Sequence, residues 1–202
     1  MKKVLAAALC AAMLTPLAAT PAMAGSPDGK LQVKLLGTGV LPDGKITKVE
    51  LDPLGLTNGA NTKANDNVVP TLAVEYFFSP NVSVETICCF TQHHVSGTGT
   101  LAAATDIVGH VLILPATLTA KYHLPLPGGI KPYVGVGPSV FFYIDEKPGA
   151  SIVPLGVTKV NMSNKLGVAL QAGVDIPVNK NGLGVSLDAK KYFMDTTAHF
   201  YA

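Results

Sequence analysis

Two alternating segments near the middle of the chain, within residues 114–142, constrain the fold most strongly. They flank the turn sequence Pro125–Gly129, whose prolines and glycines cannot continue a helix. In the first segment Leu118 has one parity, and the polar residues Thr119 and Lys121 have the other. Since neighbouring side chains of a strand point to opposite faces, each segment is predicted to be a strand with one apolar face. This pattern is typical of a membrane barrel or of a soluble sandwich.

Composition favours the membrane barrel over the sandwich. The chain is 48% hydrophobic and only 14% charged, against roughly 25% charged residues in an average soluble domain. No run of about 18 apolar residues follows the N-terminal region, which argues against a helical membrane span. An apolar band on the outside of β-strands, facing lipid, remains open.

The N-terminal region has the features of a secretory signal peptide. Lys2 and Lys3 form a short positive region, an apolar core runs from Val4 to Leu14, and Ala22–Ala24 fits the small-residue cleavage rule. We predict that residues 1–24 are a signal peptide and that residues 25–202 form one outer-membrane β-barrel domain.

The charge of the predicted mature chain gives no support for nucleic-acid binding. The sequence has no arginine, and its 15 lysines less Lys2 and Lys3 leave 13 lysines against 13 acidic residues. With no basic excess and no guanidinium group to pair with phosphates or base edges, a nucleic acid is not an expected partner.

No motif of a catalytic or cofactor site occurs in the sequence. Cys88 and Cys89 are neighbours, and adjacent side chains of a strand diverge, so we interpret them as two small apolar residues rather than a disulfide. The set most suggestive of an enzyme is His93, Ser96 and Asp106, which lacks a recognisable motif. We predict no enzyme activity, no cofactor and no metal site.

Three histidines could nevertheless gather at one rim of the barrel. His93 and His94 follow the third predicted strand, and His110 precedes the fourth. Metal binding or pH sensing is one interpretation. Solvated rim side chains are the interpretation that we favour, because adjacent histidines on a strand diverge.

The rest of the chain repeats the alternating pattern. Seven segments are predicted as strands: 31–35, 68–78, 82–90, 114–122, 133–142, 166–176 and 185–193. The connections are about 42–67, 79–81, 91–109, 125–129, 145–164 and 179–182, so long and short ones alternate. In an antiparallel meander this places all long loops at one end and all tight turns at the other, as in outer-membrane barrels.

Several stretches together resemble the OmpW family of outer-membrane proteins. They are LPATLTAKYHLP with KPYVGVG, VSVETICCF followed by a GTG segment, LGVALQAGVDIPVN and LDAKKYFMDTTA. The resemblance implies an all-β, transmembrane, antiparallel up-and-down barrel of the eight-stranded type in the outer membrane of a Gram-negative cell. It also implies a narrow channel or binding pocket for small hydrophobic molecules. The alternative is a structural or surface-recognition protein without transport activity.

The number of strands departs from this family pattern. With seven strands the first and the last run in the same direction, whereas bacterial single-chain barrels have an even number, and an open edge in lipid leaves backbone groups unsatisfied. The final strand is expected to be missing from this chain. A truncated product, closure by a second chain and a miscounted strand all explain this, and we favour truncation. The missing terminal signal also puts insertion by the barrel-assembly machinery in doubt.

The polar parity of the strands predicts which side chains face the lumen. If the apolar parity meets outer-membrane lipids, nine polar residues point inward. These lumen candidates are Lys34, Glu75, Glu85, Lys121, Tyr133, Gln171, Asp175, Asp188 and Lys190. Because unpaired charge away from water is costly, the acids and lysines should pair. We favour a salt-bridged plug over a polar conduit, with small hydrophobic solutes as the possible cargo.

Overall fold

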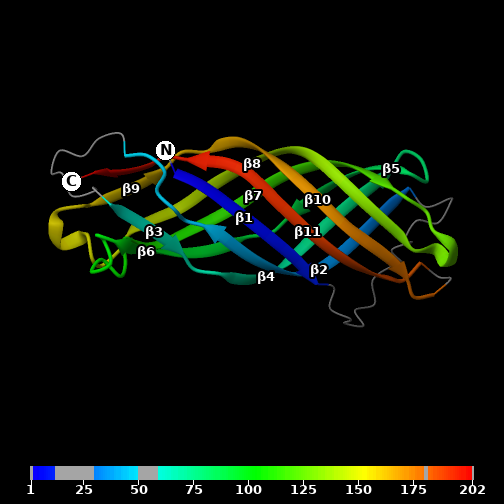
Figure 1. The fold of residues 1–202 in the computed structure, drawn as a ribbon, viewed down its shortest axis with the longest axis horizontal. Helices are drawn as coiled ribbons and strands as arrows, with labels where there is room; N and C mark the ends of the chain where they lie inside the picture. Colours follow the sequence, from blue (N-terminus) through cyan, green and yellow to red (C-terminus); the bar gives the residue numbers. More distant parts are fainter. Residues whose placement is uncertain (1, 12–29, 50–58, 180–181, 202) are drawn as a thin grey trace.

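The fold is an elongated antiparallel β-barrel (Figure 1). The computed structural model describes residues 2–11, 30–49, 59–179 and 182–201. Within these ranges the helical elements are two single 3₁₀ turns, η1 (Pro127–Gly129) and η2 (Val153–Leu155). No helix in the described part is long and apolar enough to cross a membrane.

Among the described residues, twelve strands build the barrel and its extension. They are β1 (Lys2–Ala11), β2 (Leu31–Asp43), β3 (Ala60–Ala64), β4 (Asn67–Phe77), β5 (Val82–Cys88), β6 (Thr91–Gly99), β7 (Val108–His123), β8 (Lys131–Pro148), β9 (Lys159–Met162), β10 (Lys165–Pro177), β11 (Gly184–Thr196) and β12 (Ala198–Tyr201).

Each of the seven predicted strands is present, and all pairs are antiparallel. The order β7-β5-β4-β2-β1-β11-β10-β8 returns to β7 through the β7–β8 pair. The all-β antiparallel barrel and its alternation of tight turns and long loops are thus confirmed. We call the end with residues 79–81 and 124–130 the turn end, and the end with residues 100–107 and 149–158 the loop end.

The strand β1 spans the seam between the first and the last predicted strand. It is antiparallel to both β2 and β11, with Leu9 opposite Gly39 on one side and Ala189 on the other. Since β2 and β11 run in the same direction, one strand of the opposite direction can pair antiparallel with both. These residues lie in the segment predicted as a signal peptide. Its cleavage site and Gly25 lie outside the described residues, so the division at residue 24 stays a prediction.

Three predicted loops were wrong in their extent. Residues 91–99 form β6, residues 60–64 form β3, and residues 159–162 form β9, so each predicted loop is shorter than expected. The strand β6 pairs with both β3 and β7 and thereby lengthens the barrel at the loop end, at the left of Figure 1. The sequence of β6, TQHHVSGTG, has two histidines and three hydroxyl residues and lacks the apolar alternation of the seven predicted strands. The part of the tight turn 179–182 that comprises Lys180 and Asn181 lies outside the described residues.

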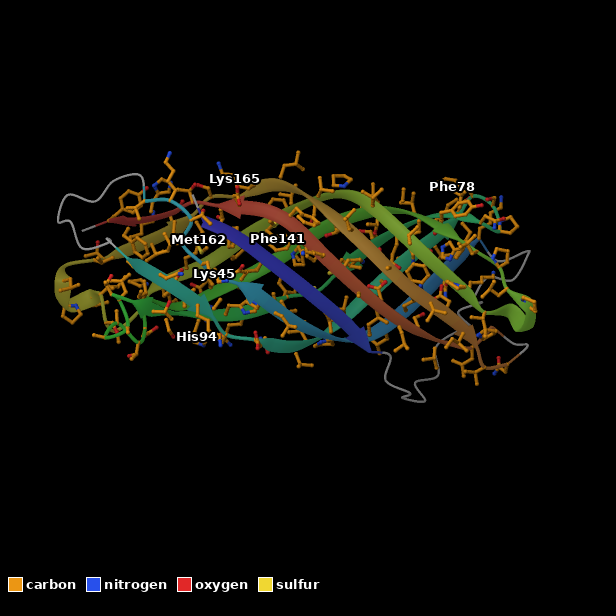
Figure 2. The ribbon with its side chains drawn as sticks, in the orientation of Figure 1. Lys45, Phe78, His94, Phe141, Met162 and Lys165 are labelled. Atoms are coloured by element: carbon orange, nitrogen blue, oxygen red, sulfur yellow. The ribbon has the colours of Figure 1, made fainter. Side chains whose placement is uncertain are left out.

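The outer surface of the central and turn-end parts is apolar. Leu35, Leu118, Val134 and Leu170 are each about half exposed, as expected for side chains that face lipid. The aromatic residues predicted for interfacial belts also point outward: Tyr76, Phe78, Tyr122, Phe142 and Phe193. Figure 2 shows Phe78 near the turn end.

The interior divides into two parts along the barrel axis. Toward the turn end it holds charged and hydroxyl side chains. Toward the loop end it holds the apolar cluster, which we define as Ala64, Val95, Ile107, Val108, Val111, Ile113, Phe141, Tyr143, Ile152, Val160, Met162, Ala169, Tyr192 and Met194. Figure 2 labels Phe141 and Met162 in this half. The predicted polar lumen is therefore found toward the turn end, whereas the interior toward the loop end is apolar.

Candidate functional site in the barrel lumen

The nine lumen candidates all come from positions with the buried parity of their strands. Each is at most 6% exposed, and they come from β2, β4, β5, β7, β8, β10 and β11. The strand register places several of them at one level, since Glu75 lies opposite Glu85 and Gln171 lies opposite Lys190. The structure thus brings residues separated by more than one hundred positions into one charge network.

Two lysines bridge three of the carboxylates. The Lys121 ammonium lies 2.9 Å from both Glu75 Oε2 and Glu85 Oε2. The Lys34 ammonium lies 2.9 Å from Glu75 Oε2 and 3.0 Å from Asp175 Oδ1, with Glu85 at 3.7 Å. Buried ions are tolerated only when their partners and hydrogen bonds are in place, and each of these five contacts joins different strands.

The third lysine completes the shell of Glu85. Lys190 Nζ donates to Glu85 Oε1 over 2.8 Å, across 105 positions of sequence. The side-chain amide of Gln171 donates to the same oxygen over 2.8 Å and to Asp188 Oδ2 over 2.5 Å. Glu85 therefore lies within 4 Å of all three lysines of the network, and we regard it as the centre.

Tyr133 connects the network to its last carboxylate and covers two lysines. Its hydroxyl donates to Asp188 Oδ2 over 2.7 Å. The Lys121 ammonium lies 3.7 Å from the centre of its ring, which is a close cation–π contact. The ring fits because Gly173 lies beneath it: a Cβ there would be 2.5 Å from the Tyr133 hydroxyl.

Sequence analysis missed three polar residues of the network. His123 Nε2 lies 2.8 Å from Glu75 Oε1, and the Ser83 hydroxyl donates to the same oxygen. The Ser186 hydroxyl donates to Asp175 Oδ1. All three have the inward parity of their strands, so parity alone could have identified them if small and uncharged side chains had been considered.

A small cavity lies between the charge network and the apolar cluster. Its volume is ≈ 30 Å³, room for about one or two water molecules. Val40, Ile87, Ile113 and Phe141 supply apolar walls, and Thr38, Thr71 and Lys190 border it on the network side. Cys89 and His93 also line it. The cavity is thus an apolar space that is limited on one side by paired charges.

The predicted histidine rim is wrong for His93. Its side chain is 1% exposed, and its ring nitrogens contact Thr91 Oγ1 and the Asn65 carbonyl oxygen, both at 2.8 Å. His94 is exposed, whereas His110 lies 3.4 Å from Asp145. Among the described residues, no group of three or more histidine, cysteine or acidic side chains could hold a metal ion.

The side chains considered for an enzyme are also used structurally. Asp106 Oδ2 accepts a hydrogen bond from the Ala150 amide over 2.8 Å, and the Asp106 amide donates to the Ser151 hydroxyl. These bonds tie the loop after β6 to the loop after β8. His93 in β6 and Asp106 in the following loop thus both make structural hydrogen bonds.

The loop end carries both apolar and polar exposed groups. Val153 and Leu155 of η2 are 51% and 71% exposed, whereas Ile152 is buried in the apolar cluster. An open cleft of ≈ 450 Å³ is lined mainly by polar residues that include Asp43, Lys45 and Lys63. The loop end therefore offers surfaces for contact with apolar or with charged partners.

Comparison with known proteins places the chain in a family. The model of the OmpW family matches residues 27–202. The chain is 32% identical over 190 residues to the uncharacterized outer-membrane protein y4mB of Sinorhizobium fredii, covering 92% of this chain and 76% of that protein. It is 29% identical over 150 residues to outer membrane protein W of Salmonella typhi, with coverage of 73% and 66%.

Two further matches are a relative whose name refers to an operon and a solved structure. The dibenzothiophene metabolism operon protein PahQ of Pseudomonas aeruginosa is 29% identical over 144 residues, which cover 71% of this chain and 64% of that protein. The crystal structure of the outer membrane protein OprG from Pseudomonas aeruginosa has a TM-score of 0.56 and 17% identity, covering 98% of this chain and 92% of that chain. The second match concerns the fold alone.

The family match extends over nearly all of the chain, and the barrel has the lipid-facing surface that an outer-membrane location requires. The chain belongs to the OmpW family of outer-membrane β-barrel proteins.

Proposed function

We propose that this barrel binds small, uncharged hydrophobic molecules in its loop-end half and serves as a narrow uptake route for them. The observation that carries the proposal is the apolar-walled cavity beneath the apolar cluster. Ligand pockets are concave and mostly apolar with a few polar groups, and this cavity has both kinds of wall. The name of the relative PahQ, which refers to dibenzothiophene metabolism, agrees with an aromatic apolar compound.

The charge network argues for a binding pocket rather than an open channel. A solute that moves along the axis meets Lys121, Glu75 and Glu85, whose side chains are at most 2% exposed and paired at 2.9 Å. An uncharged solute cannot replace these ion pairs, so axial passage requires the network to rearrange. The cavity of ≈ 30 Å³ also requires the surrounding side chains to move before a larger compound fits.

Cys89 provides a direct test, because it lines the cavity whereas Cys88 is exposed. In a Cys88→Ser variant, Cys89 is the single cysteine of residues 25–202. We expect an aromatic hydrocarbon such as naphthalene to slow alkylation of Cys89 by a small maleimide several-fold.

The matched control is Cys89→Ser, which keeps the outward Cys88. Its alkylation should be unaffected by the hydrocarbon. Equal protection of both cysteines would indicate partition of the hydrocarbon into the detergent or lipid, and no protection of Cys89 would contradict the pocket.

A second function is supported by the loop end. The exposed Val153 and Leu155 and the open polar cleft suit a structural or surface-recognition protein without transported solute. Uptake of an apolar dye into liposomes separates the two functions when the intact chain is compared with a form that lacks residues 150–157. A conduit that is reached through the loops predicts slower uptake by the deleted form, whereas equal uptake argues for recognition.

The remaining partners belong to the same proposal. Outer-membrane lipids surround the apolar band, as they do for barrels of this kind, and the barrel-assembly machinery is the expected catalyst of insertion. The absence of enzyme activity stays a prediction.

A further inference from the structure

The charges of the network do not balance. It contains four carboxylates, those of Glu75, Glu85, Asp175 and Asp188, and three ammonium groups, those of Lys34, Lys121 and Lys190. Three of the four carboxylates contact a lysine at 3.0 Å or less. Among the side chains that the structure describes, Asp188 has only neutral donors, the Tyr133 hydroxyl and the Gln171 amide. Asp188 is therefore the acid that carries the excess charge.

Two buried oxygens at this place also have no hydrogen-bond donor. They are Asp188 Oδ1 and Gln171 Oε1, on side chains that are 6% and 4% exposed. The two side chains are neighbours, because Gln171 Nε2 donates a hydrogen bond to Asp188 Oδ2. Rotating the Gln171 amide by half a turn would place its oxygen, an acceptor, against the carboxylate oxygens of Glu85 and Asp188, which are also acceptors. The rotation therefore does not supply donors to both Asp188 Oδ1 and Gln171 Oε1.

His123 does not supply the missing positive charge at this point. Its Nε2 contacts Glu75, a carboxylate that already has two lysine partners. Its Nδ1 is buried without a hydrogen-bond partner, so neither ring nitrogen contacts Asp188. The excess negative charge thus stays with Asp188.

We propose that Asp188 Oδ1 and Gln171 Oε1 form a binding site for one monovalent metal cation, Na⁺ or K⁺, inside the barrel. A single carboxylate and an amide oxygen match the charge and the hard oxygen ligands of such an ion. Ca²⁺ takes six to eight oxygens, and Mg²⁺ demands an octahedral shell in which it keeps several waters. The ion balances the network and supplies both free oxygens with a positive partner. This site is independent of the proposed solute pocket.

The test compares thermal unfolding of the isolated barrel in different salts at one ionic strength and neutral pH. Sodium and potassium chloride are compared with N-methylglucamine chloride, whose cation is too large for the site. Since a ligand that binds only the folded state stabilises it, we expect the unfolding temperature to rise by several degrees and to saturate with Na⁺ or K⁺. Asp188→Asn should abolish this rise.

Asp145→Asn is the control, because Asp145 is an exposed acid near the loop end. It should retain the full response to Na⁺ and K⁺. If Asp188→Asn does not fold, Gln171→Met provides the second variant and should weaken the response. An equal unfolding temperature in all three salts would overturn the site and indicate bound water. An unfolding temperature that depends on pH but not on the metal cation would mean that a proton neutralises Asp188. That outcome would also overturn the cation site.

Discussion

The two halves of the barrel have opposite arrangements of polar and apolar side chains. At the turn end, Leu118 and Val134 face outward, while Lys121 and Glu85 are buried. At the loop end, His94 and Lys63 face outward, while Val95 and Ala64 are buried. The outside of the first half suits lipid, and the outside of the second half suits water. The inversion indicates that β3, β6 and β9 extend beyond the hydrocarbon layer.

This comparison shows what each half needs for stability. The apolar cluster needs shape complementarity, and removing one buried methylene from it has a modest cost in the free energy of unfolding. The charge network needs complete pairing, because removing one partner leaves the others buried and unsatisfied. The two halves should therefore respond very differently to substitutions of similar size.

The largest effect is expected from Glu85→Ala. This change removes the carboxylate that Lys121 and Lys190 contact at 2.9 and 2.8 Å. Breaking a buried pair costs about 3–5 kcal/mol, so the free energy of unfolding should fall by this order. Urea unfolding, followed by the shift of the folded barrel in gel electrophoresis, measures it. Asp66→Ala, at an exposed acid, should stay within about 0.5 kcal/mol of the unchanged protein. Equal stability of the two variants would contradict the central role of Glu85.

A smaller effect is expected from Ile113→Val in the apolar cluster. Removal of one methylene from a buried isoleucine costs about 0.5–1.5 kcal/mol, and Ile113 is 6% exposed. The double variant Glu85→Ala/Ile113→Val should show additive losses within about 0.3–0.5 kcal/mol if the halves are independent. A larger deviation in the urea midpoints would mean that the two halves are coupled through the cavity.

The smallest effect is expected from Lys147→Ala. Lys147 Nζ lies 3.1 Å from Asp145 Oδ2, and both side chains are more than half exposed. Surface pairs of this kind contribute about 0–1 kcal/mol and are screened by salt. Unfolding in low and in high salt should show a difference from the unchanged protein that shrinks with added salt. A loss as large as that of Glu85→Ala would remove the contrast between buried and exposed charge.

Parity in the sequence was sufficient to predict much of the fold and the composition of the lumen. Leu118 and Thr119 fall on opposite faces of β7, and the same alternation predicted which positions of β10 and β11 are buried. It failed in β6 and β9, because outward polar residues there do not produce the apolar stripe by which a membrane strand is identified. A strand whose outward side chains are polar because they face water has the same residue composition as an ordinary loop.

The partners within the network could not be predicted in the same way. Parity indicated that Glu85 and Lys190 point inward, but which strands lie opposite each other across the lumen depends on barrel closure. Nor did the sequence indicate that Asp188 alone would lack a lysine, since four acids and three lysines permit several pairings.

The sequence by itself determined the strand alternation, the ends at which loops and turns lie, and the family, because these depend on local periodicity and on residues in order. The tertiary structure decided the pairing of the charges, the place of the cavity and the inversion of the two halves. Those depend on the stagger and closure of the sheet, which bring together side chains from distant strands.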